Sequence, residues 1–593
     1  MRWFFEIPGD DDAAGRDDDD SAPGLITLPP ALLQRHGALA LDPGNAADIP
    51  SRVPGRPPPP PPPRPTIYRA RTLLIPGDLL IPEDDQEESR FISASNAVLA
   101  GVRMRLIQPA VPRAGARRDG PGAGILGALP RPVVLAPARG EDGSARPVVV
   151  NAWVALQALR EAAARQEHQA LNEPAVSKIT LEHLLISSAI TGSGVHGHGG
   201  GLTGGPDHSS GVTGPGTTDS YTYSGGDTRT PVVLALDPPY REPADTLIPE
   251  YGRRPVVAVL DTGVRAHPWL GVGRDPQGDY IFVNDSFVVI DDAMQLAIYQ
   301  EGQNAADDGD RPRQLIQQPW DTPITANPLV GELDTDIGHC TFIAGLVRQV
   351  APNAQVLAVR IMHSDGIVYE GDLIHALGLL AERVAFAEAG DMAAMVDVVS
   401  LSLGCFDESP ADVDFSSGLW LAIEILLGLG VTVVAAAGNY STSRPFFPAG
   451  FSERPPRGTV PLISVGALNP NGTKALFSDE GRWVNTWASG VHVVSTFPTD
   501  INGSRSPEIR TRAHPAGEMP PAADLPREAL DPDDYGDSGL ATWSGTSFSA
   551  PLLAALIVRA LLAGAVGPSL NDPGAQAATD RTMAALAAMN WPG

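Results

Sequence analysis

Gly545-Thr546-Ser547-Phe548-Ser549-Ala550-Pro551 is the stretch that decides the fold, because it places a serine among small residues directly before the apolar run Leu552 to Val558. This pattern predicts a helix that starts near Ser547 and leaves the serine hydroxyl exposed. The free backbone N–H groups and the positive dipole end of such a helix favour an oxyanion beside that serine. A small-residue turn before a helix is weak evidence by itself. A base, an orienting acid and a second oxyanion donor therefore have to be sought upstream.

Apolar strand patterns alternate with helical patterns along the chain after Pro255. Short apolar strands separated by helices are typical of a parallel sheet that is covered by helices on both faces, so the expected fold class is α/β. Functional groups of such sheets gather at the carboxyl ends of the strands. The expected strands are Val256–Leu260, Val356–Ile361, Val396–Leu403 and Val431–Ala437, and the expected helices are Cys340–Val347, Gly371–Ala389 and Phe415–Leu429.

Three polar residues stand beside these elements. Asp261 directly follows an expected strand, His339 opens an expected helix, and Asn439 closes the run Ala-Ala-Ala-Gly-Asn. Taken singly, each has an ordinary structural interpretation: an aspartate that caps a turn, a packed histidine, and an asparagine in a left-handed turn. Taken together with Ser547, they supply the acid, base, amide donor and nucleophile of a serine hydrolase, in one of the known triad orders.

The motifs around these residues resemble those of subtilisin-like serine proteases (subtilases, peptidase family S8). Residues 250–593 are identified as such a protease domain, a parallel-sheet subtilisin-like catalytic domain with helices on both faces. It carries insertions near 280–331 and 498–539. The matching motifs are Asp261-Thr262-Gly263, Gly338-His339 with Thr341, Ala344 and Gly345, Ser402-Leu403-Gly404, Ala437-Gly438-Asn439, and Gly545 to Pro551.

The resemblance implies a serine endopeptidase that hydrolyses peptide bonds of a protein or peptide substrate through an acyl-enzyme. It implies that Ser547 is the nucleophile, that His339 is the base oriented by Asp261, and that Asn439 binds the oxyanion together with the Ser547 N–H. No cofactor is required for this chemistry, and structural calcium is common in the family, although no residues are assigned to it here. The implied substrate-binding residues are Ser402, Leu403, Gly404, Ala436, Ala437 and Gly438, the last three as the wall of the first pocket.

The chain departs from the family pattern near the histidine. Cys340 replaces a common glycine, and Phe342 replaces a second histidine that is not the general base. A thiol beside His339 suggests sensitivity to thiol reagents, with a buried small side chain as the simpler interpretation. The two long polar insertions predict narrow specificity for a protein or peptide precursor. The alternative function is a catalytically silent or zymogen-locked regulatory protein with the same fold, and the intact set of catalytic residues argues against it.

The region before residue 250 divides by composition. Residues 1–65 hold acidic runs and seven consecutive prolines, which predict a mostly disordered segment. Residues 66–190 have the texture of a small α+β domain, and residues 191–249 form a Gly/Ser/Thr-rich linker or loop. Two interpretations of residues 66–190 are open: a pro-domain that inhibits the protease intramolecularly and is cleaved off in the glycine-rich stretch, or a permanent regulatory or recruitment domain.

The whole-chain composition narrows the classes of partner. A formal net charge of -28 disfavours a nucleic acid and an anionic membrane surface. The two cysteines are too few for a disulfide framework. The first residues contain no long apolar run, which favours a cytoplasmic location, with export by another route as the alternative. The sequence carries no signal for an oligomeric state.

Overall fold

The computed structural model describes most of the chain between residues 28 and 591, and in addition the strand β1 (Phe5–Glu6). The polyproline run before residue 63 and the histidines of the glycine-rich stretch lie outside the described residues. The described ranges are 5–6, 28–41, 63–83, 86–110, 121–122, 124–138, 148–189, 230–234, 236–324, 333–409, 418–454, 459–501, 539–563 and 569–591.

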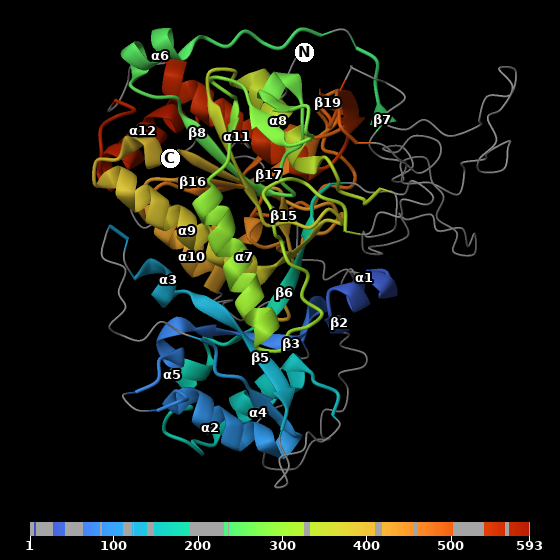
Figure 1. The fold of residues 1–593 in the computed structure, drawn as a ribbon, viewed down its shortest axis with the longest axis vertical. Helices are drawn as coiled ribbons and strands as arrows, with labels where there is room; N and C mark the ends of the chain where they lie inside the picture. Colours follow the sequence, from blue (N-terminus) through green and yellow to red (C-terminus); the bar gives the residue numbers. More distant parts are fainter. Residues whose placement is uncertain are drawn as a thin grey trace, which may run out of the picture.

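A parallel sheet forms the centre of the larger lobe, which occupies the upper part of Figure 1. Its strand order is β1-β18-β17-β16-β14-β8-β12-β11, and every neighbouring pair is parallel except β1 with β18. This arrangement confirms the α/β class. The strands are β8 (Val256–Asp261), β11 (Val288–Val289), β12 (Gln355–Arg360), β14 (Val398–Leu401), β16 (Thr432–Ala436), β17 (Leu462–Leu468) and β18 (Thr486–Ser489).

Helices cover both faces of this sheet because successive strand residues point to opposite sides. In β8, Val257 and Val259 belong to the same buried cluster as the helices α8 (His339–Val350) and α11 (Thr546–Ala563). Ala258 and Leu260 belong to the cluster on the other face, with α9 (Glu370–Glu388) and α10 (Gly418–Gly428). The expected strands and helices therefore form, with shifts of a few residues at their ends.

Helix α11 is the one helix among the described residues that is long and apolar enough to cross a membrane. It instead packs inside the protein, against α8 and the strands β14, β16 and β17. Its residues from Thr546 to Ala555 are all buried. The serine stretch thus begins a core helix.

The smaller, N-terminal lobe lies below in Figure 1 and is built on a second, antiparallel sheet. Its strands are β2 (Ala38–Leu41), β3 (Thr66–Pro76), β4 (Met104–Leu106), β5 (Pro130–Pro137) and β6 (Thr180–Ser187), and its helices are α1 (Pro30–Arg35), α2 (Arg90–Leu99), α3 (Ile125–Ala128), α4 (Ala152–Ala164) and α5 (Glu173–Val176). Helices α2 and α4 start at good caps, since Ser89 accepts from the Ile92 N–H and Asn151 from the Trp153 N–H.

Strand β6 joins the two lobes. It pairs with β3 on one side and with β13 (Ile367–Tyr369) of the larger lobe on the other, and β15 (Leu403–Gly404) pairs with its last residues. In Figure 1, β6 rises out of the lower lobe toward β15. Its residues are buried throughout. The N-terminal sheet is therefore completed by strands of the larger lobe, which no composition boundary predicted.

The prediction that residues 1–65 are mostly disordered is wrong for residues 28–41. This stretch forms α1 and β2, and β2 extends the antiparallel sheet by pairing with β3. Leu32 and Leu41 are buried there. The buried His36 bonds to the Asp365 carboxylate at 3.0 Å and to the Tyr369 hydroxyl at 2.8 Å. Contacts with residues over three hundred positions away order this stretch, and the local composition carries no sign of them.

The first insertion is also built into the interface of the lobes. Its helix α7 (Asp292–Asp307) places Glu301 against Arg131 of β5, in a two-point ion pair of 2.8 and 2.6 Å. Beyond the helix, Asp310 accepts from Arg69 of β3, and Arg313 pairs with Asp372. A two-point guanidinium–carboxylate pair fixes orientation as well as distance. The insertion therefore clamps the N-terminal lobe onto the sheet.

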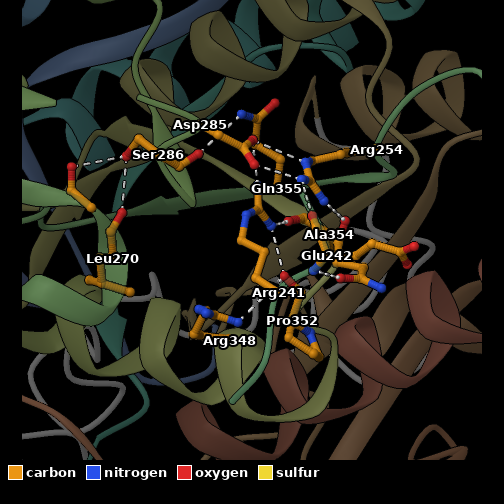
Figure 2. A network of polar contacts seen from close by, with 12 residues as sticks. Arg241, Glu242, Arg254, Leu270, Asp285, Ser286, Arg348, Pro352, Ala354 and Gln355 are labelled. Atoms are coloured by element: carbon orange, nitrogen blue, oxygen red, sulfur yellow. Dashed lines mark hydrogen bonds and ion pairs between the residues drawn. The ribbon is translucent and has the colours of Figure 1, made fainter. Parts of the chain in front are cut away.

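A polar network anchors the opposite, amino end of the sheet (Figure 2). Arg254, just before β8, forms a two-point pair with Asp285 at 3.2 and 2.7 Å and donates to the Glu242 carbonyl at 2.6 Å. Arg241 donates to the carbonyls of Pro352 and Ala354, which precede β12. These contacts fix the amino ends of the neighbouring strands β8 and β12. Their carboxyl ends lie at the opposite edge of the sheet.

The remaining described elements flank this core. The hairpin of β9 (Val272–Arg274) and β10 (Tyr280–Phe282) stacks Tyr280 on Trp320 at 4.0 Å between ring centroids. A small sheet of β19 (Val493–Thr496), β20 (Leu540–Trp543) and β7 (Thr230–Pro231) leads into α11. The helices α6 (Ala244–Tyr251) and α12 (Ala575–Ala588) complete the larger lobe.

Candidate active site

The structure brings Asp261 and His339 together at the carboxyl edge of the sheet. Asp261 is the last residue of β8, and His339 is the first residue of α8. The His339 Nδ1 lies 2.9 Å from each Asp261 carboxylate oxygen. Burial by itself would lower the pKa of His339, but the charge and hydrogen bond of Asp261 outweigh it, so the pKa is raised above its ordinary 6.5.

The other ring nitrogen of His339, Nε2, takes no part in the contact with Asp261. It is buried and makes no hydrogen bond within the part of the chain that the structure describes. Trp543 and Phe548 both pack against the ring, each with its centroid 5.5 Å from that of His339. Phe342, which replaces the family's second histidine, packs against Phe548 at 4.7 Å. An imidazole held in this way can take up a proton at Nε2.

Ser547 is fully buried, so the expected exposed hydroxyl is wrong. Its Oγ donates to the Ser402 carbonyl oxygen at 3.2 Å. In return, the Ser402 hydroxyl donates to the Ser547 carbonyl at 2.8 Å. The hydroxyl is buried because a segment of the same chain covers it, namely the end of β6 and the two residues that follow.

Ser188, the residue after β6, places its carbonyl oxygen between two donors. The Ser547 backbone N–H donates to it at 3.1 Å, and the Asn439 side-chain amide donates to it at 2.5 Å. The Ser188 N–H donates to the Ser402 carbonyl at 3.0 Å. One peptide carbonyl of the chain is thus polarised by the N–H at the start of α11 and by an amide, as an oxyanion hole would polarise it.

The residues before Ser188 lie extended between two strands of the larger lobe. Ser187 and Ile186 pair antiparallel with Leu403 and Gly404. On the other side, Ile186, Leu185 and Leu184 pair with residues 367 to 369 of β13. The expected pairing partner of a substrate, Ser402-Leu403-Gly404, is therefore occupied by the chain itself. This is main-chain recognition by strand addition on both edges.

Asn439 and the wall residues follow β16. The Asn439 side-chain oxygen accepts from the Thr546 N–H at 3.0 Å and from its hydroxyl at 2.9 Å, which directs the amide nitrogen toward Ser188. The Thr546 hydroxyl also accepts from the Gly438 N–H at 3.1 Å. Ala436 and Ala437 are fully buried. The residues expected at the site thus come from five segments: the end of β8, the start of α8, the β14–β15 segment, the end of β16 with the loop after it, and the start of α11.

Asp321, in the first insertion, is a site residue that the motifs did not reveal. Its Oδ2 accepts from the Gly338 N–H at 2.7 Å and from the Thr262 hydroxyl at 3.0 Å. These two residues are the immediate neighbours of His339 and Asp261. Burial, opposed mainly by Arg360, raises the pKa of Asp321 to about 6. The only signal in the sequence was an acidic residue in a long insertion, which does not identify a partner.

Steric contacts explain why the Asp261-Thr262-Gly263 motif ends in glycine. Gly263 has φ of 88°, and a Cβ there would lie 2.3 Å from the Pro319 carbonyl oxygen. A side chain at this position would therefore meet the loop that carries Asp321 and be strained as well. The glycine allows the insertion to approach Asp261 closely.

The two cysteines are free and buried. Burial raises the pKa of the Cys340 thiol well above its usual range, and the nearby Asp261 carboxylate adds to the effect. Because the thiolate is the reactive form, Cys340 has the character of a small buried side chain rather than of a reactive thiol. Burial likewise raises the pKa of the Cys405 thiol well above its usual range.

Metal ligands do not gather at this site. Among the residues that the structure describes, no cluster of three or more histidine, cysteine, aspartate or glutamate residues could hold a metal ion. The calcium expectation from the family resemblance therefore has no candidate residues in those ranges.

The chain is similar to several known proteins. The sequence model of the subtilase family matches residues 252–564. The chain is similar to a thermophilic serine proteinase from Bacillus sp. (strain AK1), with 30% identity over 199 residues that make up 34% of this chain and 42% of the relative. It is 30% identical to thermitase from Thermoactinomyces vulgaris over 190 residues, 30% of this chain and 59% of the relative.

One further relative and one solved structure also match the chain. Subtilisin BL from Lederbergia lenta is 31% identical over 189 residues, which cover 30% of this chain and 61% of the relative. A solved structure, that of a serine-to-alanine mutant of the protease domain of PatA, has 18% identity and a TM-score of 0.29, and covers 52% of this chain and 78% of that chain. The matches thus span between 42% and 61% of the length of these three curated relatives.

Proposed function

Because the subtilase model covers more than half of its length, this chain belongs to the subtilase family, and we propose that it is a serine endopeptidase with the triad Asp261, His339 and Ser547. The observation that carries the proposal is the Ser188 carbonyl, which two donors hold beside the nucleophile and the paired histidine. The substrate is a protein or peptide that lies extended along Ser402-Leu403-Gly404. No cofactor takes part in the chemistry.

Acylation starts when the Ser547 Oγ leaves the Ser402 carbonyl and turns toward His339. The Oγ attacks the substrate carbonyl carbon while His339 Nε2, which has no other partner, takes the hydroxyl proton. The C–N bond then breaks, and the same Nε2 returns the proton to the leaving amine. Water hydrolyses the acyl-enzyme by the reverse sequence of proton transfers, and Asp261 stabilises the imidazolium in both steps.

The first substrate in this proposal is the chain's own Ser188–Ala189 bond. Its carbonyl already lies between the oxyanion donors, and the preceding residues already pair with both edge strands. The N-terminal lobe then acts as an intramolecular inhibitor whose last strand keeps the cleft filled until it dissociates. In this proposal the cleaved bond lies directly before the glycine-rich stretch of residues 191–249, and not within it.

Replacing Asn439 with alanine is expected to lower kcat by about a hundredfold to a thousandfold, because one oxyanion donor is lost while the triad keeps its geometry. The KM for a peptide substrate should change little, since the amide acts mainly on the charge of the transition state. Steady-state kinetics of the processed enzyme measure both constants. A variant in which KM rises while kcat stays unchanged would contradict the assigned role.

Replacing Asp321 with alanine is expected to lower kcat roughly tenfold to a hundredfold, because the residues next to His339 and Asp261 lose a shared acceptor and small misplacements of catalytic groups are costly. The matched variant Asp321→Asn keeps an acceptor oxygen of the same size and should retain most of the activity. Equal losses in the two variants would show that the carboxylate charge, rather than the two hydrogen bonds, is what matters.

Fluorophosphonate labelling together with intact mass measurement tests the proposal directly. An active endopeptidase should be labelled at Ser547 and should appear as two fragments that divide after Ser188. The competing function is a regulatory protein that keeps the fold without turnover. It predicts an undivided chain that resists labelling even after limited proteolysis has removed the N-terminal lobe.

A further inference from the structure

Phe446 lies between the two walls of the first substrate pocket. A Cβ placed on Gly404 would meet the Phe446 Cε1 at 2.3 Å and its Cδ1 at 2.6 Å. A Cβ placed on Gly438 would lie 3.0 Å from the same Cδ1. The ring therefore packs against the bare backbone of Gly404, at the end of β15, and close to Gly438, next to Asn439.

The ring is held in that position from several sides. Its side chain is fully buried. Phe406 and Tyr440 pack against it with centroid distances of 5.1 and 5.5 Å. The next residue, Phe447, exchanges two backbone hydrogen bonds of 2.8 Å with Cys405, which directly follows β15. A large side chain in a packed site of this kind cannot move aside without opening a cavity.

The residue that the pocket receives is small. Ser188 is bonded through its N–H to Ser402 and through its carbonyl to Asn439, so its backbone is held by the same two loops that carry Gly404 and Gly438. The Ser188 hydroxyl is buried and has no hydrogen-bond partner in the described structure. Alanine would fit the same space without the cost of an unpaired polar group.

Resting on the proposed function, we propose that Phe446 fills the floor of this pocket and restricts the enzyme to bonds that follow a small residue: alanine, serine or glycine. A side chain as large as phenylalanine or leucine at that position would overlap the ring, and overpacking of a rigid site is strongly unfavourable. The narrow specificity expected from the insertions thus has a second and more direct source. The substrate class is a peptide with a small residue on the acyl side of the cleaved bond.

The first test compares two peptides that differ only in that residue, alanine or phenylalanine, at concentrations of enzyme fixed by fluorophosphonate titration. The wild type should cleave the alanine peptide with a kcat/KM at least about a hundredfold higher. Phe446→Gly should reduce or invert this ratio. The matched control Phe451→Leu changes a buried aromatic residue whose ring packs on Phe447 and Trp420, away from both glycines, and should leave the ratio unchanged. Equal cleavage of both peptides by the wild type would overturn the proposal.

The second test needs no turnover and therefore separates this proposal from the proposed function. In full-length protein carrying Ser547→Ala, the further substitution Ser188→Phe should lower the melting temperature by on the order of a few degrees, because the new ring overlaps Phe446. The same substitution in a Phe446→Gly background should cost little or nothing. Identical shifts in the two backgrounds would refute the pocket assignment whether or not the wild type is active.

A folding defect in Phe446→Gly would be visible in its own melting curve. The variant Phe446→Leu then takes its place, because leucine is smaller than phenylalanine but still fills most of the space below the pocket. It should show a partial change of the peptide ratio in the same direction. A folded Phe446→Leu protein with the wild-type ratio and no coupling to residue 188 would count against the proposal.

Discussion

Replacing Ser547 with alanine is expected to leave the chain at its full 593 residues and to abolish peptide hydrolysis. The loss in kcat should be about a millionfold, because removal of the nucleophile disables the triad as a unit. The fold should persist, since the lost Oγ makes a single hydrogen bond of 3.2 Å, to the Ser402 carbonyl. Intact mass measured over time after synthesis, compared with the wild type, reads out this prediction.

Ser549→Ala is the matched control for that experiment. Ser549 lies in the same first turn of α11, is equally buried, and donates to the Ala488 carbonyl at 3.1 Å rather than to anything at the site. It should divide after Ser188 as the wild type does. A Ser547→Ala chain that still divides there, in the absence of any other protease, would show that the cleavage is not self-processing.

Replacing Asp261 with asparagine is expected to lower kcat about ten-thousandfold, because the amide no longer holds the His339 tautomer that leaves Nε2 free to accept a proton. Substrate binding should be nearly unchanged, since Asp261 lies behind the histidine. Steady-state kinetics of a chain processed in trans by wild-type enzyme, followed by removal of that enzyme, give both constants.

The pH profile adds a second readout to the same variant. His339 must be neutral to act as a base, so activity falls as the pH drops through its pKa. Burial lowers that pKa, and Asp261 raises it to a net value above 6.5. Without the Asp261 charge burial dominates, so the acid limb of the residual activity should move to lower pH. An unchanged acid limb would contradict the assignment of that limb to His339.

Asp336→Asn is the comparison variant for the pH experiment. Asp336 also raises the pKa of His339 through its charge, but its effect is smaller than that of Asp261. Its replacement should move the acid limb less than Asp261→Asn does. Because the tautomer is kept, the kcat at the plateau should fall far less than ten-thousandfold.

Local sequence patterns were sufficient to predict the alternating strands and helices of the parallel sheet. The apolar run at Val256 predicted β8 with Asp261 at its end, and the serine stretch predicted the start of α11. Both are short-range signals, since a buried strand and a helix start are written in adjacent residues. The same local composition gave the wrong result for residues 28–41, whose order depends on contacts with Asp365 and Tyr369.

The sequence by itself therefore determined the class of fold and predicted the set Asp261, His339, Asn439 and Ser547, because each motif is carried by a few consecutive residues. Only the tertiary structure shows three further contacts: the Ser188 carbonyl between the Ser547 N–H and the Asn439 amide, the Asp321 carboxylate on the Gly338 N–H, and the Phe446 ring against Gly404. All three join residues far apart in the sequence. Antiparallel pairing of a distant strand, or a ring against a glycine, leaves no periodic pattern in either partner, so only the folded chain reveals it.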